Sequence, residues 1–138
     1  MRLQQEGAHV EQRKINPWKW QDQFGFSQGI ETTNASRVLY CAGQASVDES
    51  GTPLHAGDMR KQIEQAFRNL ETVLSAAGFK LENVVRLNFY ATDVDAFLAA
   101  GDVVGRCLAG TQPPGTLLGI SKLAFPGLMI EMEATAAK

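Results

Sequence analysis

The sequence predicts one α+β domain in which a mixed sheet is covered on one face by two helices. Three observations support this fold class. Segments with strand-like patterns flank two stretches with helical spacing, at residues 58–77 and 93–108. The chain has 138 residues, 44% of them hydrophobic, which suits a single domain with its own core. Two amphipathic helices can cover only one face of such a sheet, so the other face needs a different cover.

The first 24 residues form a polar leader, and residues 25–138 are expected to make up the main domain. A short strand is predicted near residues 10–15. Trp18 and Trp20 follow this strand, and we expect both rings to pack on the domain or on a neighbouring subunit, because each ring can bury roughly 200 Å² of surface. The leader is therefore expected to be held against the domain.

The first half of the domain is predicted to contain two strands and the clearest helix. The strands are expected at residues 26–33 and 37–42. Apolar residues recur at helical spacing through residues 58–77, where Asp58 is a suitable N-cap and Gly78 suits the position just past the helix end. The charged face of this helix is expected to be solvated, with a weak pair between Glu64 and Arg68.

The second half of the domain begins with a strand of alternating side chains at residues 83–92. One set faces one way and a second set the other: Val85, Leu87, Phe89 and Ala91, against Arg86, Asn88, Tyr90 and Thr92. A second helix is predicted from Asp93 or Asp95 to Leu108. Its inner stripe is expected to hold Val94, Phe97, Leu98, Val104 and Leu108. Gly101 and Gly105 interrupt the pattern, and each destabilises the helix by about 1 kcal/mol relative to alanine. We expect these two glycines to allow close packing on the sheet.

Two further strands are predicted near the C-terminus, at residues 116–123 and 128–134, joined by a turn at 125–127. Glu131 and Glu133 alternate with apolar residues on the second strand, so they join the polar residues of the preceding strand on one side of the sheet. A sheet face that is half apolar and half polar is a poor final surface for a monomer. We therefore expect this face to be buried in a symmetric oligomer.

Composition and short motifs exclude several classes of function. The formal net charge of -2 gives no basis for binding a nucleic-acid backbone, and no apolar run approaches the roughly 20 residues that span a bilayer. His9 and His55 are isolated, so no metal site is expected, and nucleotide-binding glycine motifs are absent. The N-terminus lacks the apolar core of a secretory signal, and Cys41 and Cys107 are expected to be buried free thiols, which favours a cytoplasmic protein.

Glu131 has the strongest individual claim to a chemical role. It lies between Ile130 and Met132 on a strand that is expected to be central or nearly so. A carboxylate in that setting must be paired, hydrogen-bonded or functional. One interpretation is a structural ion pair with Arg86. The other is that Glu131 lies in a ligand pocket and orients a water molecule or a polar substrate.

Several short motifs occur together between residues 25 and 136. They are Ser27-Gln28-Gly29, Tyr40-Cys41-Ala42-Gly43-Gln44, Ala76-Ala77-Gly78, Gln112-Pro113-Pro114 and Ile130-Glu131-Met132-Glu133-Ala134. In this combination the chain resembles the Rid (YjgF) family of reactive-intermediate deaminases, also called L-PSP endoribonucleases. The resemblance implies a chorismate-mutase-like fold and a homotrimer whose sheets line a central barrel, with a pocket at each subunit interface. It also implies hydrolysis of 2-enamines and 2-imines to 2-keto acids and ammonia without a cofactor.

The resemblance carries over to some site positions and not to others. In the family, a glutamate positions the attacking water and an arginine binds the substrate carboxylate. The glutamate matches Glu131, whereas Gly115 stands at the arginine position. Phe26 replaces a tyrosine, Ala42 a serine and Leu117 a cysteine. The chain is thus similar to arginine-lacking members of the family, for which binding of 2-imino acids should be sharply weaker.

These observations lead to hypotheses of different classes. In the first, a homotrimer binds a small metabolite in interfacial pockets, and Glu131 activates water to hydrolyse an imine, an enamine or a related compound. In the second, the pockets bind or sense a metabolite without catalysis; endoribonuclease activity ranks third. The substrate-binding residues are expected to be Phe26, Ser27, Arg86, Asn88, Tyr90, Gly115 and Thr116. The sequence leaves open the ligand, the presence of catalysis, and whether Arg86 or Lys122 replaces the missing arginine.

Overall fold

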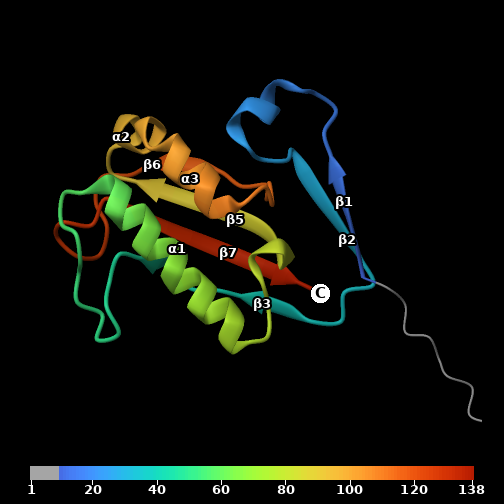
Figure 1. The fold of residues 1–138 in the computed structure, drawn as a ribbon, viewed down its shortest axis with the longest axis horizontal. Helices are drawn as coiled ribbons and strands as arrows, with labels where there is room; N and C mark the ends of the chain where they lie inside the picture. The colour runs from blue at the N-terminus through green and yellow to red at the C-terminus, as the bar shows by residue number, and fades with distance from the viewer. Residues whose placement is uncertain (1–9) are drawn as a thin grey trace, which may run out of the picture.

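The computed structural model describes residues 10–138, and its main body is a five-stranded sheet with helices on one face (Figure 1). The strands are β3 (Val38–Tyr40), β4 (Gln44–Ala45), β5 (Val84–Ala91), β6 (Leu117–Gly119) and β7 (Ile130–Ala137). The helices are α1 (Met59–Ala76), α2 (Val94–Ala99) and α3 (Gly101–Leu108), with 3-10 turns η1 (Trp20–Phe24) and η2 (Leu81–Asn83). A hairpin of β1 (Glu11–Ile15) and β2 (Gly29–Thr33) lies beside the sheet. The predicted α+β fold class is confirmed.

The strand β7 organises the sheet. It pairs antiparallel with β3, β4 and β5, and β5 pairs in parallel with β6. The two C-terminal strands therefore follow each other in sequence without pairing, because β5 lies between them. The two strands predicted before the long helix also belong to different sheets, since β2 pairs with β1 and β3 pairs with β7. The strand β6 is shorter than the predicted segment 116–123.

The side chains of β5 and β7 divide between the two faces nearly as predicted. On β7 the apolar residues point to the helices, and Glu131 and Glu133 point away. On β5, Val84 takes the core position that was expected for Val85, because a bulge between Val84 and Arg86 shifts the register. The face away from the helices is called the open face below.

The helix α1 begins and ends where predicted. Asp58 is its N-cap, with a carboxylate that accepts a hydrogen bond from the N–H three residues on, and Gly78 follows the helix end with a φ of 79°. The fully buried Gln62 donates to the carbonyl of Gly127 at 2.8 Å and accepts from the N–H of Met129 at 2.8 Å. Gln62 thereby holds the loop that leads into β7.

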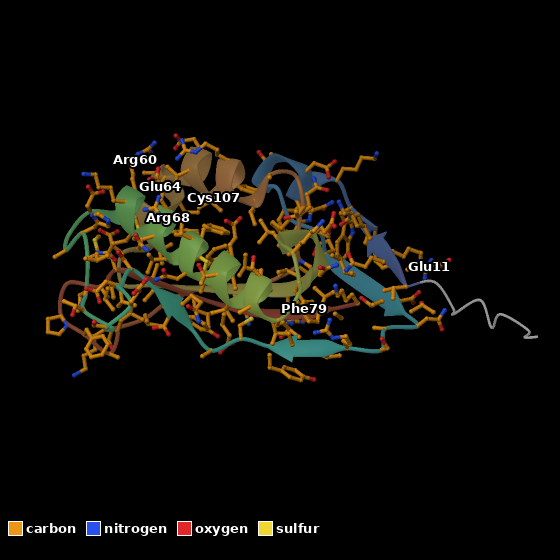
Figure 2. The ribbon with its side chains drawn as sticks, turned by 60° about the horizontal axis from the view of Figure 1, so that its bottom comes forward. Glu11, Arg60, Glu64, Arg68, Phe79 and Cys107 are labelled. Atoms are coloured by element: carbon orange, nitrogen blue, oxygen red, sulfur yellow. The ribbon has the colours of Figure 1, made fainter. Side chains whose placement is uncertain are left out.

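The charged face of α1 is connected to α3, contrary to the expected solvated surface. Arg60 donates two hydrogen bonds to the carboxylate of Asp102, at 2.9 and 2.7 Å, and this interaction lowers the pKa of Asp102 to about 2. Arg106 donates to Glu64 at 2.6 Å, so the predicted pair of Glu64 with Arg68 is wrong. Figure 2 shows Arg60, Glu64 and Arg68 along the side of α1 next to α3. Because these pairs are exposed, they stabilise the helix contact only modestly.

The second predicted helix is in fact two helices, separated at Ala100. Asp93 caps α2 by accepting the N–H of Ala96. The break changes which residues face the core: Val103 is buried, whereas Leu98 is 56% exposed, contrary to the predicted stripe. A Cβ added at Gly101 or Gly105 would meet no atom within 4 Å. The expectation that these glycines allow close packing is therefore wrong.

Three predictions concern the thiols, the membrane and metals. Cys41 and Cys107 are free, as predicted, but only Cys41 is buried; Cys107 is partly exposed, contrary to the prediction, and partial burial raises the pKa of both thiols. Within residues 10–138, no helix has the length and apolar character needed to cross a bilayer. The same residues contain no group of three or more potential metal ligands, and His9 lies outside them.

Candidate functional site

The candidate catalytic residue, Glu131, lies on the open face of the sheet. It is half-buried in β7, opposite Ala45 of β4 and Tyr90 of β5. Its carboxylate lies against the backbone of Gly43, since a Cβ built on Gly43 would come within 1.8 Å of Oε1. Only glycine leaves room for the carboxylate in this position. Sequence reasoning noticed Gly43 as part of a motif but assigned it no role.

The neighbours of Glu131 are a tyrosine and a second carboxylate. The hydroxyl of Tyr90 donates to Oε1 of Glu133 at 3.1 Å. Burial, followed by this hydrogen bond, raises the pKa of Tyr90, so the phenol keeps its proton at neutral pH. The alternative of a structural pair between Arg86 and Glu131 is wrong, because Arg86 is exposed and lies opposite Thr135. The ion pairs found within residues 10–138 involve neither residue.

Gly115, which the sequence analysis matches to the arginine position of the family, approaches β5 more closely than any other residue type could. The N–H of Leu87 donates to the carbonyl of Pro114, and the N–H of Phe89 donates to that of Thr116, both at 2.9 Å. Gly115 lies between these two bonds, where an added Cβ would be 1.7 Å from the carbonyl oxygen of Leu87. The absence of a side chain here is thus a property of the backbone path, and a larger residue would push the segment away from β5.

Asn88 explains part of this irregular pairing. In a regular parallel ladder, the N–H of Thr116 would donate to the carbonyl of Leu87. It donates instead to Oδ1 of Asn88, at 3.0 Å. Asn88 therefore holds the segment that contains Gly115 and Thr116, which is a structural role beside its predicted contact with substrate.

Phe26 and Ser27 connect the leader to the domain. The N–H of Ser27 donates to the carbonyl of Gln112 at 3.1 Å, and the buried hydroxyl of Ser27 has no partner within residues 10–138. The ring of Trp20 meets the ring of Phe26 edge-on, with centroids 5.7 Å apart. Trp20 and Trp18 remain 54% and 60% exposed, so a single chain does not bury them as expected.

Apart from Ser27, the predicted site residues fall into two groups, one on each side of β5. Glu131 and Tyr90 lie on the open face. Phe26, Gly115 and Thr116 line a cavity of about 510 Å³ on the helix side, between η1, α3 and the edge formed by β5 and β6. Sequence reasoning missed this cavity, although two costly glycines inside one helical pattern were a visible signal of it.

Comparisons with known proteins agree on one family. The model of the endoribonuclease L-PSP family matches residues 21–138. A crystal structure from Yersinia pestis, of a protein of unknown function in the conserved Rid family, is 33% identical with a TM-score of 0.83, covering 92% of this chain and 98% of that one. The mitochondrial protein mmf2 of Schizosaccharomyces pombe is 31% identical over 78% of this chain and 86% of that protein. The 2-iminobutanoate/2-iminopropanoate deaminase of Mus musculus is 27% identical over 82% of this chain and 81% of that protein.

Proposed function

This chain belongs to the endoribonuclease L-PSP (Rid, YjgF) family, and we propose that it hydrolyses a small imine or enamine at the open face of its sheet. The observation that carries the proposal is the setting of Glu131. Its carboxylate is half-buried, lies against Gly43 and beside Tyr90, and has no cation paired with it within residues 10–138. A carboxylate held in this way can accept a proton from an attacking water molecule.

The proposed reaction needs only water and one base. The imine reacts with its nitrogen protonated, as an iminium ion; water adds to its carbon while Glu131 takes one proton of that water, which gives a neutral carbinolamine. Glu131 then returns this proton to the nitrogen, and the C–N bond breaks as the hydroxyl oxygen forms the C=O bond. The released ammonia or amine takes the remaining hydroxyl proton and leaves as an ammonium ion, so the products are a carbonyl compound and an ammonium ion, the carboxylate is regenerated and no cofactor takes part.

The proposed substrate carries no carboxylate near the reacting carbon. A guanidinium group binds a carboxylate through two parallel hydrogen bonds, and Gly115 offers none. Tyr90 is the residue of β5 opposite Glu131, and Arg86 lies four residues before it. At the usual rise per residue of a strand, Arg86 and Tyr90 are about 13 Å apart. Lys122 is exposed, outside β6. We propose that neither cation replaces the missing arginine within one chain.

We expect the purified protein to hydrolyse an uncharged imine, N-benzylidenemethylamine, faster than buffer does, with benzaldehyde release followed by absorbance. With freshly generated 2-aminoacrylate we expect pyruvate release at the buffer rate. Without the two guanidinium–carboxylate hydrogen bonds, binding of this substrate should be weaker on the order of 100-fold. Glu131→Gln is the control, since it keeps the shape and removes the base. Rapid pyruvate release by the wild-type protein would contradict the proposed substrate class.

A metabolite-binding or regulatory role without catalysis is the second candidate. It is favoured by the lost arginine, since a family member without the carboxylate clamp can keep a pocket and lose the reaction. Equal ligand affinity for the wild-type protein and Glu131→Gln, with no turnover by either, would support it.

Endoribonuclease activity is less well supported, because the net charge is -2 and the chain has only two separated histidines. We also propose a reducing, cytoplasmic setting, because both cysteines are free.

We propose that three chains assemble through their open faces. This face exposes apolar side chains on β3 and β6, with Tyr40 79% exposed, Val38 51% and Leu118 48%. Such a surface is costly in a monomer and suits burial in a symmetric assembly. Light scattering should give a molar mass three times the 15.0 kDa of one chain. A mass of 15.0 kDa at micromolar concentration would contradict the assembly and the interfacial pockets with it.

A further inference from the structure

A groove lies between α1 and α3, and Figure 2 shows Glu64, Arg68 and Cys107 next to one another along it. Its volume of about 470 Å³ falls in the range of small-molecule sites. Arg106 and Cys107 of α3 line this groove, whereas the cavity on the helix side of β5 uses other residues of the same helix. The groove is therefore separate from that cavity, and also from Glu131 on the open face.

Four charged side chains act on the thiol of Cys107 in this groove. Burial raises the pKa of Cys107 most, so the thiol keeps its proton at neutral pH. Two arginines lower this pKa and two glutamates raise it, namely Arg106, Arg68, Glu64 and Glu71. The four charges therefore lie around one partly exposed, uncharged thiol.

Two of these charges form an ion pair with each other, and two do not. Arg106 donates to Glu64 at 2.6 Å, which joins α3 to α1 and neutralises both groups. Arg68 donates to Oε1 of Gln65 at 3.1 Å. Neither Arg68 nor Glu71 belongs to an ion pair in the part of the chain that the structure describes. One guanidinium and one carboxylate are thus available to a charged partner from solution.

The spacing of Arg68 and Glu71 suits a ligand that carries both signs of charge on neighbouring groups. Residues three apart lie on the same face of a helix, with Cβ atoms about 5–6 Å from each other. Arg68 can bind a carboxylate through two parallel hydrogen bonds, and Glu71 can accept hydrogen bonds from an ammonium group. A ligand with only a carboxylate would be repelled by Glu71, and a simple amine would be repelled by Arg68. An α-amino acid has both groups on one carbon and avoids this repulsion.

The floor of the groove is apolar. Phe67 lines it and is only 3% exposed, and the uncharged thiol of Cys107 and the methyl group of Ala109 lie in the same lining. A thiol that keeps its proton behaves as a small apolar group. An apolar side chain placed here would leave water, and each CH₂ group removed from water strengthens binding.

We propose that the groove between α1 and α3 binds a free α-amino acid with an apolar side chain. The carboxylate of the ligand lies on Arg68, its ammonium group on Glu71, and its side chain on Phe67 and Cys107. The site does not rest on the proposed hydrolysis at Glu131, so either proposal can fail without the other.

The test uses L-norleucine as the probe and the rate of alkylation of Cys107 by iodoacetamide as the readout, followed by mass spectrometry on the full chain. We expect L-norleucine to slow this alkylation saturably, while the buried Cys41 reports any general change in stability and should be unaffected. Hexanoate lacks the ammonium group and pentylamine the carboxylate, so each should bind more weakly by about fivefold or more. Absence of protection by L-norleucine, or equal protection by hexanoate or pentylamine, would overturn the proposal.

Variants at exposed positions test the two charges without disturbing the core. Arg68→Gln and Glu71→Gln should each weaken the binding of L-norleucine by about fivefold. Glu71→Gln should bind hexanoate at least as well as the wild type does, because the repelling carboxylate is gone. Lys61→Gln is the matched control, since Lys61 is exposed on α1 outside the lining, and it should bind L-norleucine as the wild type does. Unchanged binding in Arg68→Gln or Glu71→Gln, or an equal loss in Lys61→Gln, would contradict the proposed site.

Discussion

Gly115→Ala is expected to destabilise the protein by about 3 kcal/mol, although it adds a single methyl group. That methyl would stand 1.7 Å from the carbonyl oxygen of Leu87, and the obstacle is backbone that cannot rotate away. The segment would have to move off β5 and weaken the two hydrogen bonds that flank Gly115. For a chain of this length the Tm should fall by roughly 10 °C, measured by differential scanning calorimetry at fixed protein concentration.

Gly101→Ala is the matched control, because it makes the same chemical change where a Cβ meets no atom within 4 Å. It should be neutral or stabilising by up to about 1 kcal/mol. Gly115→Arg should be at least as destabilising as Gly115→Ala and should not confer pyruvate release from 2-aminoacrylate. If Gly115→Arg is stable and has deaminase activity, the prediction is wrong. The backbone at residue 115 would then accept an arginine side chain.

Gly43→Ala is expected to lower the rate of imine hydrolysis on the order of 100-fold, as much as the direct loss of the base in Glu131→Gln. The new methyl would lie 1.8 Å from Oε1 of Glu131 and 2.7 Å from its carboxyl carbon. The side chain of Glu131 must therefore rotate away from the place where it would hold the attacking water. The measurement is kcat and KM for N-benzylidenemethylamine in the three proteins.

Gly29→Ala serves as the control for Gly43→Ala, because its Cβ would make only an ordinary contact of 3.7 Å with Ile15. It should leave hydrolysis unchanged. A double-variant cycle gives a second readout that does not need a substrate: the loss of stability in Gly43→Ala should shrink when Glu131 is also replaced by alanine. Equal loss of stability in both backgrounds would show that Gly43 does not act through Glu131.

Local pattern was sufficient to predict the long elements. The helix α1, with Asp58 and Gly78 at its ends, and the alternation of β7 follow from side-chain spacing within one segment. The break between α2 and α3 was not predictable in this way, because the pattern shows which residues are apolar and not how a short helix turns at Ala100. The bulge in β5, which puts Val84 in the core instead of Val85, was not predicted either, because an alternating pattern does not show where a strand is irregular.

The candidate site was predictable only in part. The resemblance to the Rid family led to the predictions that Glu131 is the catalytic residue and that Gly115 stands at the arginine position, without any coordinates. It did not reveal that Arg86 is too distant from Glu131 to pair with it, since that depends on the register of β5 against β7. Nor did it reveal the cavity, whose walls bring residues 23–26 together with residues between 87 and 117.

The sequence by itself determined the fold class and the family, because these depend on periodicity and on short motifs, and the same motifs led to the proposal that Glu131 is the catalytic residue. The tertiary structure alone decided what the glycines do. Gly43 makes room for the carboxylate of Glu131, and Gly115 lets its own segment pack closely against β5. Gly101 and Gly105 line a cavity and contact nothing at the position of a Cβ. A glycine has no side chain to show its purpose, so its role depends entirely on which atoms of distant segments come near it.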